Sequence, residues 1–446
     1  MNERAKRLAL ALLRWEWLLL ALLLLVAVGP LVTWLPLLLL IPLLWLVRRL
    51  ATGHFVPPTP LDLSLLALLL MVLVSLFATP EPAYSAPKVV GLVYGIALFY
   101  AVVAATGRGT RPLQMGVVLL FGGGVGVALV GLVGTQWGNK LPLLGGLAAR
   151  LPLNQPGQLA AGQGFNANQV AGVLLWVLPW AALLGLAALL AWRGLVAQWG
   201  WGRTAAGLLL WGAGTLLMAG VFLLTQSRSA YVGLLAALLF LLLVGLRRRP
   251  WLLGGLVAAG GLLLVGLLVL GPPELPGRAA ALLGLGREAA GAAALNTLAG
   301  RAEIWQRALY GIQDFPLTGL GMNMFRRVQP VLYPFVTLSA TNDVAHAHNH
   351  LLQTALDVGL PGLVAYMALW LGAAGMLWQS WRRAATMWPR LLALGFAASL
   401  LAYFVYGLTD AVSLGARPGF IFWLLLGLVA GLYAWVGARA GDVPAG

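Results

Sequence analysis

The stretch LLTQSRSAYVGLLAALLFLLLVGLRRR, Leu223 to Arg249, decides the fold class of this chain. Its centre is an apolar run long enough to cross the hydrocarbon core of a bilayer as a helix, and three arginines follow that run directly. Because lysine and arginine collect in cytoplasmic loops, Arg247 to Arg249 mark the inner side. The stretch therefore predicts a transmembrane helix whose polar start, around Arg228, lies on the outer side.

The same alternation of long apolar runs and short polar joints continues along the whole chain. Of its 446 residues, 61% are hydrophobic and 9% are charged, whereas roughly 25% of residues are charged in an average soluble domain. The pattern predicts an all-α integral membrane protein with about twelve transmembrane helices, or about eleven if the short second stretch shares one crossing with the first. The predicted stretches cover residues 17–34, 36–47, 61–78, 89–105, 113–134, 169–191, 205–225, 229–246, 251–270, 350–378, 389–406 and 417–438.

The positions of lysine and arginine predict how these helices are oriented. With the N-terminus inside, basic residues fall at the inner ends of the helices, so both termini are predicted to be cytoplasmic. Residues 1–270 then hold about nine transmembrane helices, residues 271–349 form a large extracytoplasmic loop, and residues 350–446 hold about three more helices. The inner-side residues are Arg4, Lys6, Arg7, Arg14, Arg48, Arg49, Arg108, Arg111, Arg193, Arg203, Arg247, Arg248, Arg249, Arg382, Arg383, Arg390 and Arg439.

The formal net charge of +16 resembles that of nucleic-acid-binding proteins. The orientation signal and the attraction of basic residues to anionic lipid headgroups account for most of this charge, so we expect membrane lipids as partners and no nucleic acid. The chain contains no cysteine, which excludes disulfides and thiolate chemistry.

The large outer loop contains the segment NTLAGRAEIWQRALYGIQDFP, which has the pattern of a helix. Asn296 or Thr297 can cap its start, and the DFP sequence ends it. Arg301 and Trp305 share a face at a spacing of four residues, whereas Arg307 lies on another face. The loop is therefore predicted to be a folded cap with short helices. Its apolar positions are Ile304, Trp305, Ala308, Leu309 and Ile312.

Arg228 lies at the outer edge of the membrane, where the orientation rule offers no reason for an arginine. Ser227 or Ser229 can cap the helix that follows, and the free N–H groups at its start form an anion site beside the guanidinium. This combination suits a phosphate group. The alternative is an arginine that extends toward the lipid headgroups, as arginines at the ends of membrane helices often do.

Three of the four histidines, His346, His348 and His350, lie within five residues. In a strand they would share a face and resemble a metal site, whereas in a helix they would point in different directions. No carboxylate stands three or four residues after any of them, and Asp343 is the one acid nearby in the sequence. The sequence therefore favours no metal site.

A helix that begins near Asn349 would place His348 at its N-terminal edge, beside the outer membrane surface. A histidine with an ordinary pKa of about 6.5 is suited to accept a proton near neutral pH. His348 is therefore a candidate general base. The alternative is a run of histidines that is merely exposed at the surface.

Four stretches resemble, in order, successive blocks of the O-antigen ligase and polymerase family. They are GFNANQVAGVLLWVLP (Gly164–Pro179), TQSRSAYVGLL (Thr225–Leu235), GRAEIWQRALYGIQDFPLTGLGMNMF (Gly300–Phe325) and AHNHLLQTALDVGLPGL (Ala347–Leu363). The resemblance implies a GT-C-like membrane glycosyltransferase. Such an enzyme transfers a glycan from an undecaprenyl diphosphate carrier to an acceptor, which is a lipid A-core sugar in ligases and another lipid-linked glycan in polymerases.

The resemblance also implies roles for individual residues and a location. Arg228 and Arg301 match the arginines that hold the diphosphate, and His348, before Asn349, matches the proposed base. With them we group Ser227, Trp305 and Asn349 as candidate substrate-binding residues. The expected location is the cytoplasmic (inner) membrane of a bacterium, with the site facing the periplasm or outside.

The chemistry of such a donor needs few protein groups. A glycosyl diphosphate carries its own leaving group, so cations for the growing charge and a base for the attacking hydroxyl suffice. Direct displacement inverts the anomeric centre. No DxD-like acidic pair lies in the outer loops, so the sequence predicts a metal-independent reaction without a cofactor.

Three other functions remain open at this point. An O-antigen or exopolysaccharide repeat-unit polymerase would use the same donor chemistry. A peptidoglycan-type polymerase would use the same carrier but an aspartate in the outer loop. A lipid-linked glycan transporter would show matched repeats with interrupted helices in both halves, and no such repeat is visible in this sequence.

Overall fold

The computed structural model describes residues 3–13, 40–107, 109–137, 144, 146, 165–247, 249, 298–339 and 343–440. Two very short strands, β1 (Thr135–Gln136) and β2 (Phe165–Asn166), pair in parallel; the other regular elements of this part are helices. The helices are α1 (Glu3–Leu13), α3 (Leu40–Thr52), α4 (Asp62–Ala78), α5 (Pro82–Thr106), α6 (Thr110–Gly134), α8 (Ala167–Leu175), α9 (Leu178–Leu190), α10 (Trp192–Trp199), α11 (Trp201–Leu224), α12 (Arg228–Leu246), α15 (Leu298–Asp314), α16 (Phe325–Leu332), α17 (His350–Arg383), α18 (Met387–Gly407), η3 (Arg417–Gly419) and α19 (Phe420–Ala440).

Seven helices of the described chain are long and apolar enough to cross a membrane, and the bent pair α8 and α9 adds an eighth if it forms one span. The pair bends by 46°. These helices confirm the prediction of an all-α integral membrane protein, although the count of about twelve stays a prediction. Helix α4 is apolar but shorter than the spanning helices. Helix α3 overlaps the predicted second stretch, 36–47. The predicted stretches 17–34 and 251–270 lie outside the described residues. The spanning helices are α5, α6, α11, α12, α17, α18 and α19.

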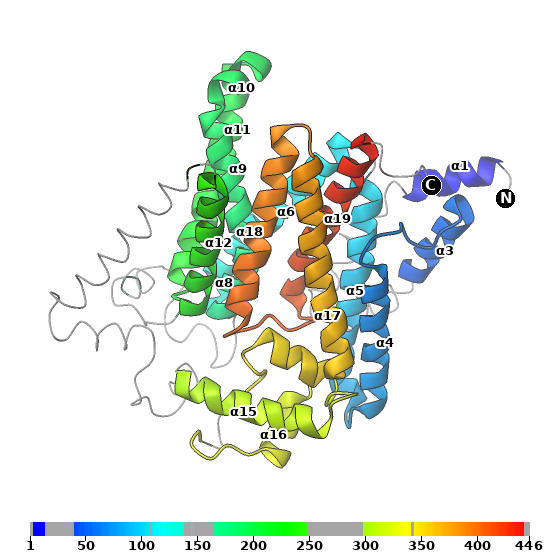
Figure 1. The fold of residues 1–446 in the computed structure, drawn as a ribbon, viewed down its shortest axis with the longest axis vertical. Helices are drawn as coiled ribbons and strands as arrows, with labels where there is room; N and C mark the ends of the chain where they lie inside the picture. Colours follow the sequence, from blue (N-terminus) through cyan, green and yellow to red (C-terminus); the bar gives the residue numbers. More distant parts are fainter. Residues whose placement is uncertain are drawn as a thin grey trace.

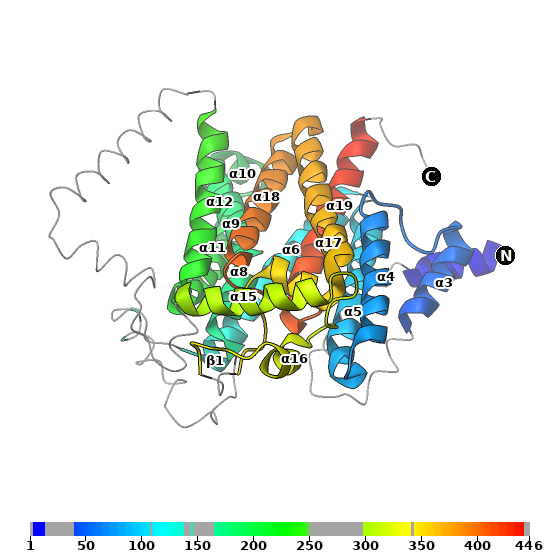
Figure 2. The same cartoon turned by 60° about the horizontal axis from the view of Figure 1, so that its bottom comes forward.

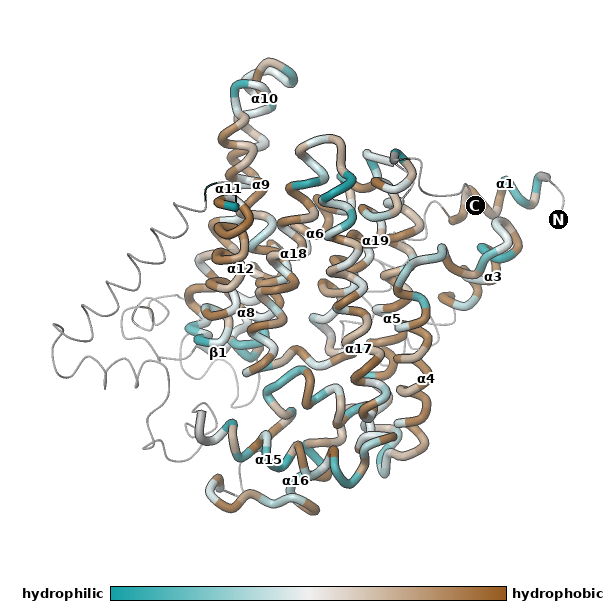
Figure 3. The backbone as a smooth tube through the Cα atoms, in the orientation of Figure 1, coloured by the Kyte–Doolittle hydropathy of each residue, from teal (hydrophilic) through white to brown (hydrophobic). Residues whose placement is uncertain are grey.

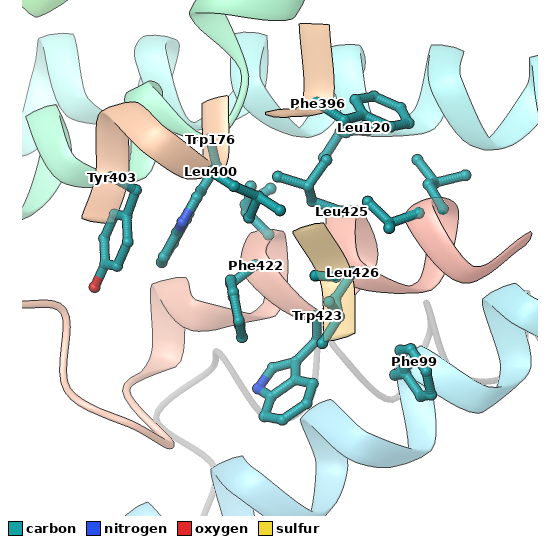
Figure 4. Packing of buried hydrophobic residues seen from close by; sticks show 14 of the residues in the cluster. Phe99, Leu120, Trp176, Phe396, Leu400, Tyr403, Phe422, Trp423, Leu425 and Leu426 are labelled. Carbon is teal, nitrogen blue, oxygen red and sulfur yellow. The ribbon is translucent and has the colours of Figure 1, made fainter. Parts of the chain in front are cut away.

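The long helices stand side by side in one bundle (Figure 1). Helix α12 packs on α18, α19 packs on α5, and α17 packs on α4. Aromatic side chains fill the space where α8, α18 and α19 meet (Figure 4): the rings of Trp176 and Tyr403 lie 4.4 Å apart, and those of Trp176 and Phe422 lie 5.7 Å apart. Large rings exclude water over a wide area, so this core fixes the positions of the helices that carry the site.

Helices α15 and α16 lie across one end of the bundle, and the first residues of α12 and α17 point toward that end (Figure 2). The cap has a core of its own, in which Ile304, Ala308 and Met324 are fully buried together with Leu356 of α17. Hydrophilic residues collect in this cap and at the ends of the bundle, whereas the middle parts of the long helices are hydrophobic (Figure 3). The described part of the predicted loop therefore contains two helices and a core, and its place on the extracytoplasmic side stays a prediction. The predicted caps Asn296 and Thr297 lie outside that part.

The cap is fastened to a kink in α17. The backbone of Gly359 has φ 73°, a conformation that favours glycine, and a Cβ atom there would lie 2.3 Å from the carbonyl oxygen of Leu317. On each side of the kink, a backbone hydrogen bond joins α17 to the turn after α15. Leu320 N–H donates to Leu356 C=O at 2.7 Å, and Leu360 N–H donates to Pro316 C=O at 2.7 Å. The turn after α15 and the first segment of α17 therefore form one unit.

Candidate functional site

The first residues of α12 join the cap through a side-chain hydrogen bond. Ser227 stands at the N-cap position but makes no capping hydrogen bond with its side chain, and the hydroxyl of Ser229 accepts a hydrogen bond from Arg301 Nη1 at 3.2 Å. The predicted N-cap position of Ser227 is therefore confirmed, but the capping side-chain hydrogen bond is not formed. Ser229 instead ties α12 to α15, because the helix start faces the arginine of the cap.

Arg301 lies in α15 and turns its guanidinium toward the bundle. Its Nη2 is 3.7 Å from Oδ2 of Asp410, and only 12% of the Arg301 side chain and 2% of the Asp410 side chain are exposed. Asp410 follows the end of α18 and accepts a hydrogen bond from Ala411 N–H at 2.9 Å. The charges of Arg228 and Arg301 act on each other, so the two arginines predicted from the sequence belong to one positively charged region.

Asp410 also contacts His348, since its Oδ1 lies 3.2 Å from His348 Nδ1. Burial alone raises the pKa of Asp410, but the hydrogen bond with His348 and the nearby positive charges hold that pKa below its usual range. An ionised carboxylate only accepts, so Nδ1 of His348 donates to it, and the tautomer of the neutral ring that fits this contact has its lone pair on Nε2. Asp410 therefore contacts both His348 and Arg301 and fixes the orientation of the His348 ring.

Asn349 holds the backbone next to His348. Its Oδ1 accepts hydrogen bonds from Leu351 N–H at 2.9 Å and Leu352 N–H at 3.1 Å, and its Nδ2 donates to Leu408 C=O at 2.9 Å. Asn349 is therefore the N-cap of α17 and also ties this helix to the end of α18. Its predicted contact with substrate stays a prediction, and both polar ends of its side chain are already engaged.

The three histidines occupy two environments. His346 and His348 have ring centroids 4.3 Å apart, and Nδ1 of His346 accepts the backbone N–H of His348 at 3.2 Å. Burial is the main cause that lowers the pKa of His346 to about 3, so this imidazole is neutral at physiological pH. His350 instead points into an aromatic cluster, with Nδ1 2.9 Å from the hydroxyl of Tyr366 and its ring 4.9 Å from that of Phe404. His350 therefore points away from His348, whereas His346 lies beside it.

His346, His348 and Asp410 form a cluster that has the spacing of a metal site, because one ligand atom from each lies within 4.8 Å of the others. The sequence argument against a metal was therefore incomplete, because Asp410, the acid of this cluster, lies 62 positions after His348. Asp343, the acid nearby in the sequence, pairs with Arg326. The charges around the cluster favour an anion, because Arg301 contacts Asp410 and the charge of Lys88 also acts on His346.

Several buried donors beside Arg301 have no hydrogen-bond partner among the described residues. They are the Ser227 hydroxyl, Arg301 Nε and Trp305 Nε1. Arg301 and Trp305 share a face of α15, as their spacing predicts, and Ser227 stands beside the start of α12 that Arg301 contacts. Leaving such donors unpaired costs about 1–3 kcal/mol each. An anion with several oxygen atoms would pair with them.

Sequence reasoning missed Asp410, because this residue belongs to no DxD-like pair. It follows the predicted stretch 389–406 in the sequence YGLTDA, at the outer edge of a membrane helix. An acid at that position is costly unless it is paired, and this is the signal that could have marked it. Its partners are separated from it in the sequence, so only the packed helices identify them.

Glu303 attaches the cap to the following segment, and we expect Glu303→Gln to loosen residues 336–338. The carboxylate accepts hydrogen bonds from Thr337 and from the N–H groups of Val336 and Leu338. Burial raises the pKa of Glu303, but these hydrogen bonds outweigh it and lower the pKa from 4.5 to about 2. The stabilisation is therefore present above pH 4.5 and is lost as the pH falls toward 2.

Hydrogen exchange of the backbone N–H groups of Val336 and Leu338 measures this effect. In the unmutated protein, protection should persist at neutral pH and decrease between pH 4.5 and 2. In Glu303→Gln it should be reduced already at neutral pH. The exposed residue Gln306, substituted by Glu, serves as the control on the same helix. Equal protection in Glu303→Gln and the control would show that the carboxylate does not hold the segment.

Comparison with known proteins finds similarity to O-antigen ligases. Residues 213–367 match the family model described as O-antigen ligase. A curated protein named O-antigen ligase, from Pseudomonas aeruginosa, is 28% identical over 227 residues, which are 50% of this chain and 47% of that protein. The matched region thus spans about half the length of the curated relative. The family match includes Arg228, Arg301 and His348, but Asp410 lies beyond it.

Proposed function

Because residues 213–367 match the O-antigen ligase family model, we propose that the protein transfers a glycan from an undecaprenyl diphosphate-linked donor to an acceptor hydroxyl. The match and the spanning helices support a multi-pass membrane protein of a glycan ligase family. The acceptor would be a sugar of lipid A-core or another lipid-linked glycan. The second case would make the protein a repeat-unit polymerase with the same chemistry.

The observation that carries this proposal is the chain of contacts Arg301–Asp410–His348. It places a cation 3.7 Å from one carboxylate oxygen and an imidazole 3.2 Å from the other. A glycosyl transfer from a diphosphate needs a cation for the leaving group and a base for the acceptor. A buried aspartate that contacts both groups holds them at a fixed separation.

The diphosphate would bind between α12 and α15. Arg228 and Arg301 supply the positive charge, and guanidinium groups bind phosphate oxygens through two parallel hydrogen bonds. The unpaired Ser227 hydroxyl and Trp305 Nε1 are further donors. The arginines bind the donor in the ground state and stabilise the charge that accumulates as the diphosphate leaves.

His348 would act on the acceptor. Its Nε2 accepts the proton of the acceptor hydroxyl while that oxygen forms a bond to the anomeric carbon. The bond from this carbon to the diphosphate oxygen breaks, and undecaprenyl diphosphate leaves with both electrons of that bond. Asp410 stabilises the positive imidazolium that results. The displacement inverts the anomeric centre.

The cap end of the bundle would face the periplasm or outside, in the cytoplasmic membrane of a bacterium. Helix α12 starts at this end with Arg228 and runs toward Arg247, and α17 starts there with His350 and runs toward Arg382 and Arg383. The basic ends of both helices therefore lie away from the cap, as the positive-inside rule requires for an outer-facing site. A GT-C-like arrangement is part of the same proposal.

The purified protein, in detergent or vesicles with a lipid-linked glycan and an acceptor, tests this function. We expect release of the carrier diphosphate in equal amount to the glycan joined to the acceptor. Offering lipid A-core or lipid-linked glycan as the acceptor distinguishes a ligase from a polymerase. Movement of the intact lipid-linked glycan across vesicles, without carrier release, would identify a transporter and overturn the proposal.

Arg228→Lys is expected to lose most of the activity. A lysine ammonium is a single point charge and cannot bind two phosphate oxygens in the planar, two-donor geometry of a guanidinium. Initial rates and donor affinity of the purified variant measure the effect, with Arg203→Lys at the other end of the bundle as the control. Full turnover of a correctly folded Arg228→Lys protein would rule out the two-donor contact.

Removal of divalent metal is expected to leave the activity intact. The arginines would already neutralise the diphosphate, and the positive charge of Arg301, 3.7 Å from the Asp410 carboxylate, disfavours a cation at the histidine cluster. Activity in EDTA, compared with activity after adding back Mg²⁺ or Zn²⁺, measures the requirement. Loss in EDTA with recovery by either ion would make His346, His348 and Asp410 metal ligands.

A further inference from the structure

A residue of α17 holds the histidine segment in addition to Asp410. Gln353 is buried, with 2% of its side chain exposed, and its Oε1 accepts the backbone N–H of Ala347 at 2.8 Å. Ala347 lies directly between His346 and His348. The position of this peptide group therefore determines where the His348 side chain leaves the backbone.

Asp357, one turn further along α17, fixes the orientation of the Gln353 amide. Its Oδ1 accepts Gln353 Nε2 at 2.8 Å and the backbone N–H of Asn323 at 3.0 Å. The backbone N–H of Ala347 can only donate, so the amide must turn its oxygen to Ala347 and its NH2 group to Asp357. Asp357 is 2% exposed, and the positive charge of Lys88 acts on it from α5.

This network joins the two halves of the proposed site. Asn323 belongs to the turn that follows α15, the helix that carries Arg301, and the same turn is bonded to the α17 kink through Leu320 and Leu356. One path from Arg301 to His348 runs through Asp410. The second runs along the cap to Asn323 and then through Asp357 and Gln353 to Ala347.

We propose that Gln353 and Asp357 are positioning residues for the glycosyl transfer, and that they hold His348 at a fixed place relative to Arg301. This inference rests on the proposed function. Neither side chain contacts the reacting groups, so their effect passes through the backbone of Ala347. A misplacement of the base by about 1 Å can cost on the order of 100-fold in rate.

The first test uses Gln353→Met, which keeps the length of the side chain and removes both hydrogen bonds. We expect turnover to fall by about 10- to 100-fold with little change in donor KM. Thr354→Val is the matched control, because Thr354 is equally buried and bonds only to His350 C=O in its own helix at 2.7 Å. In a His348→Ala background, Gln353→Met should cause no further loss, since its effect passes through His348.

The second test exchanges donor and acceptor within the network. Gln353→Glu alone places two carboxylates together and should lower turnover. Adding Asp357→Asn restores the complementarity: the new amide donates to the new carboxylate and still accepts from Asn323, and the net charge facing Lys88 is unchanged. We expect the double variant to recover turnover to within about threefold of the unmutated protein.

Three results would overturn the inference while leaving the proposed function in place. The first is an active unmutated protein whose Gln353→Met variant behaves like Thr354→Val. The second is an additional loss from Gln353→Met in the His348→Ala background. The third is a double variant that is no better than Gln353→Glu. An unmutated protein that transfers no glycan would instead contradict the proposed function.

Discussion

His348→Ala is expected to reduce turnover by about 10²–10⁴-fold with little change in donor affinity, because a positioned general base contributes that much to rate. The substitution removes the group that takes the proton of the acceptor hydroxyl. It leaves the arginines and Ser229 in place, and Arg301 keeps its contact with Asp410 at 3.7 Å. Initial rates at saturating donor, together with binding of the lipid-linked donor, separate the two quantities.

The neighbouring histidines are the controls for this prediction. His350→Phe keeps an aromatic ring in the cluster of Tyr366 and Phe404 and should leave most of the turnover. His346→Ala removes one hydrogen bond to the backbone of His348 and should have a milder effect than His348→Ala. Equal losses in all three variants, accompanied by loss of a bound metal, would make the cluster a metal site and refute the assignment of the base.

Asp410→Asn should lower turnover by a similar factor, up to about 10⁴-fold. The amide can donate to Nδ1 of His348, which places the proton on Nε2 and leaves no lone pair for the acceptor hydroxyl. It also removes the negative charge that stabilises the imidazolium. Donor affinity should not fall, because Arg301 loses a competing partner. Rates and donor binding of the same preparation measure both effects.

Asp343→Asn is the matched control for Asp410→Asn. Asp343 is 57% exposed and pairs with Arg326 on the surface of the cap, and exposed ion pairs contribute at most about 1 kcal/mol. This variant should keep full activity. If Asp410→Asn were as active as Asp343→Asn, the carboxylate would have no part in orienting His348.

Several features of the site were predictable because they depend on short stretches of sequence. The length of an apolar run determines whether it can cross a membrane, and this property identified the bundle. The spacing of apolar residues identified the start of α17 near Asn349, whereas the structure alone shows that Asn349 caps this helix. The spacing of Arg301 and Trp305 placed both on one face of α15. A charged residue at the edge of a membrane is costly and is therefore a candidate for function, and this argument identified Arg228.

The sequence by itself determined the membrane class, the folded cap and the residue types of the candidate site, because each follows from the local order of apolar, charged and helix-capping residues. Only the tertiary structure decided which groups meet. Asp410 reaches His348 and Arg301, and Gln353 reaches Ala347, because packing of α15, α17 and α18 brings separate segments within hydrogen-bonding distance. Helical periodicity specifies the face of one helix but not its neighbour, so a buried charge could be recognised from the sequence while its partner could not.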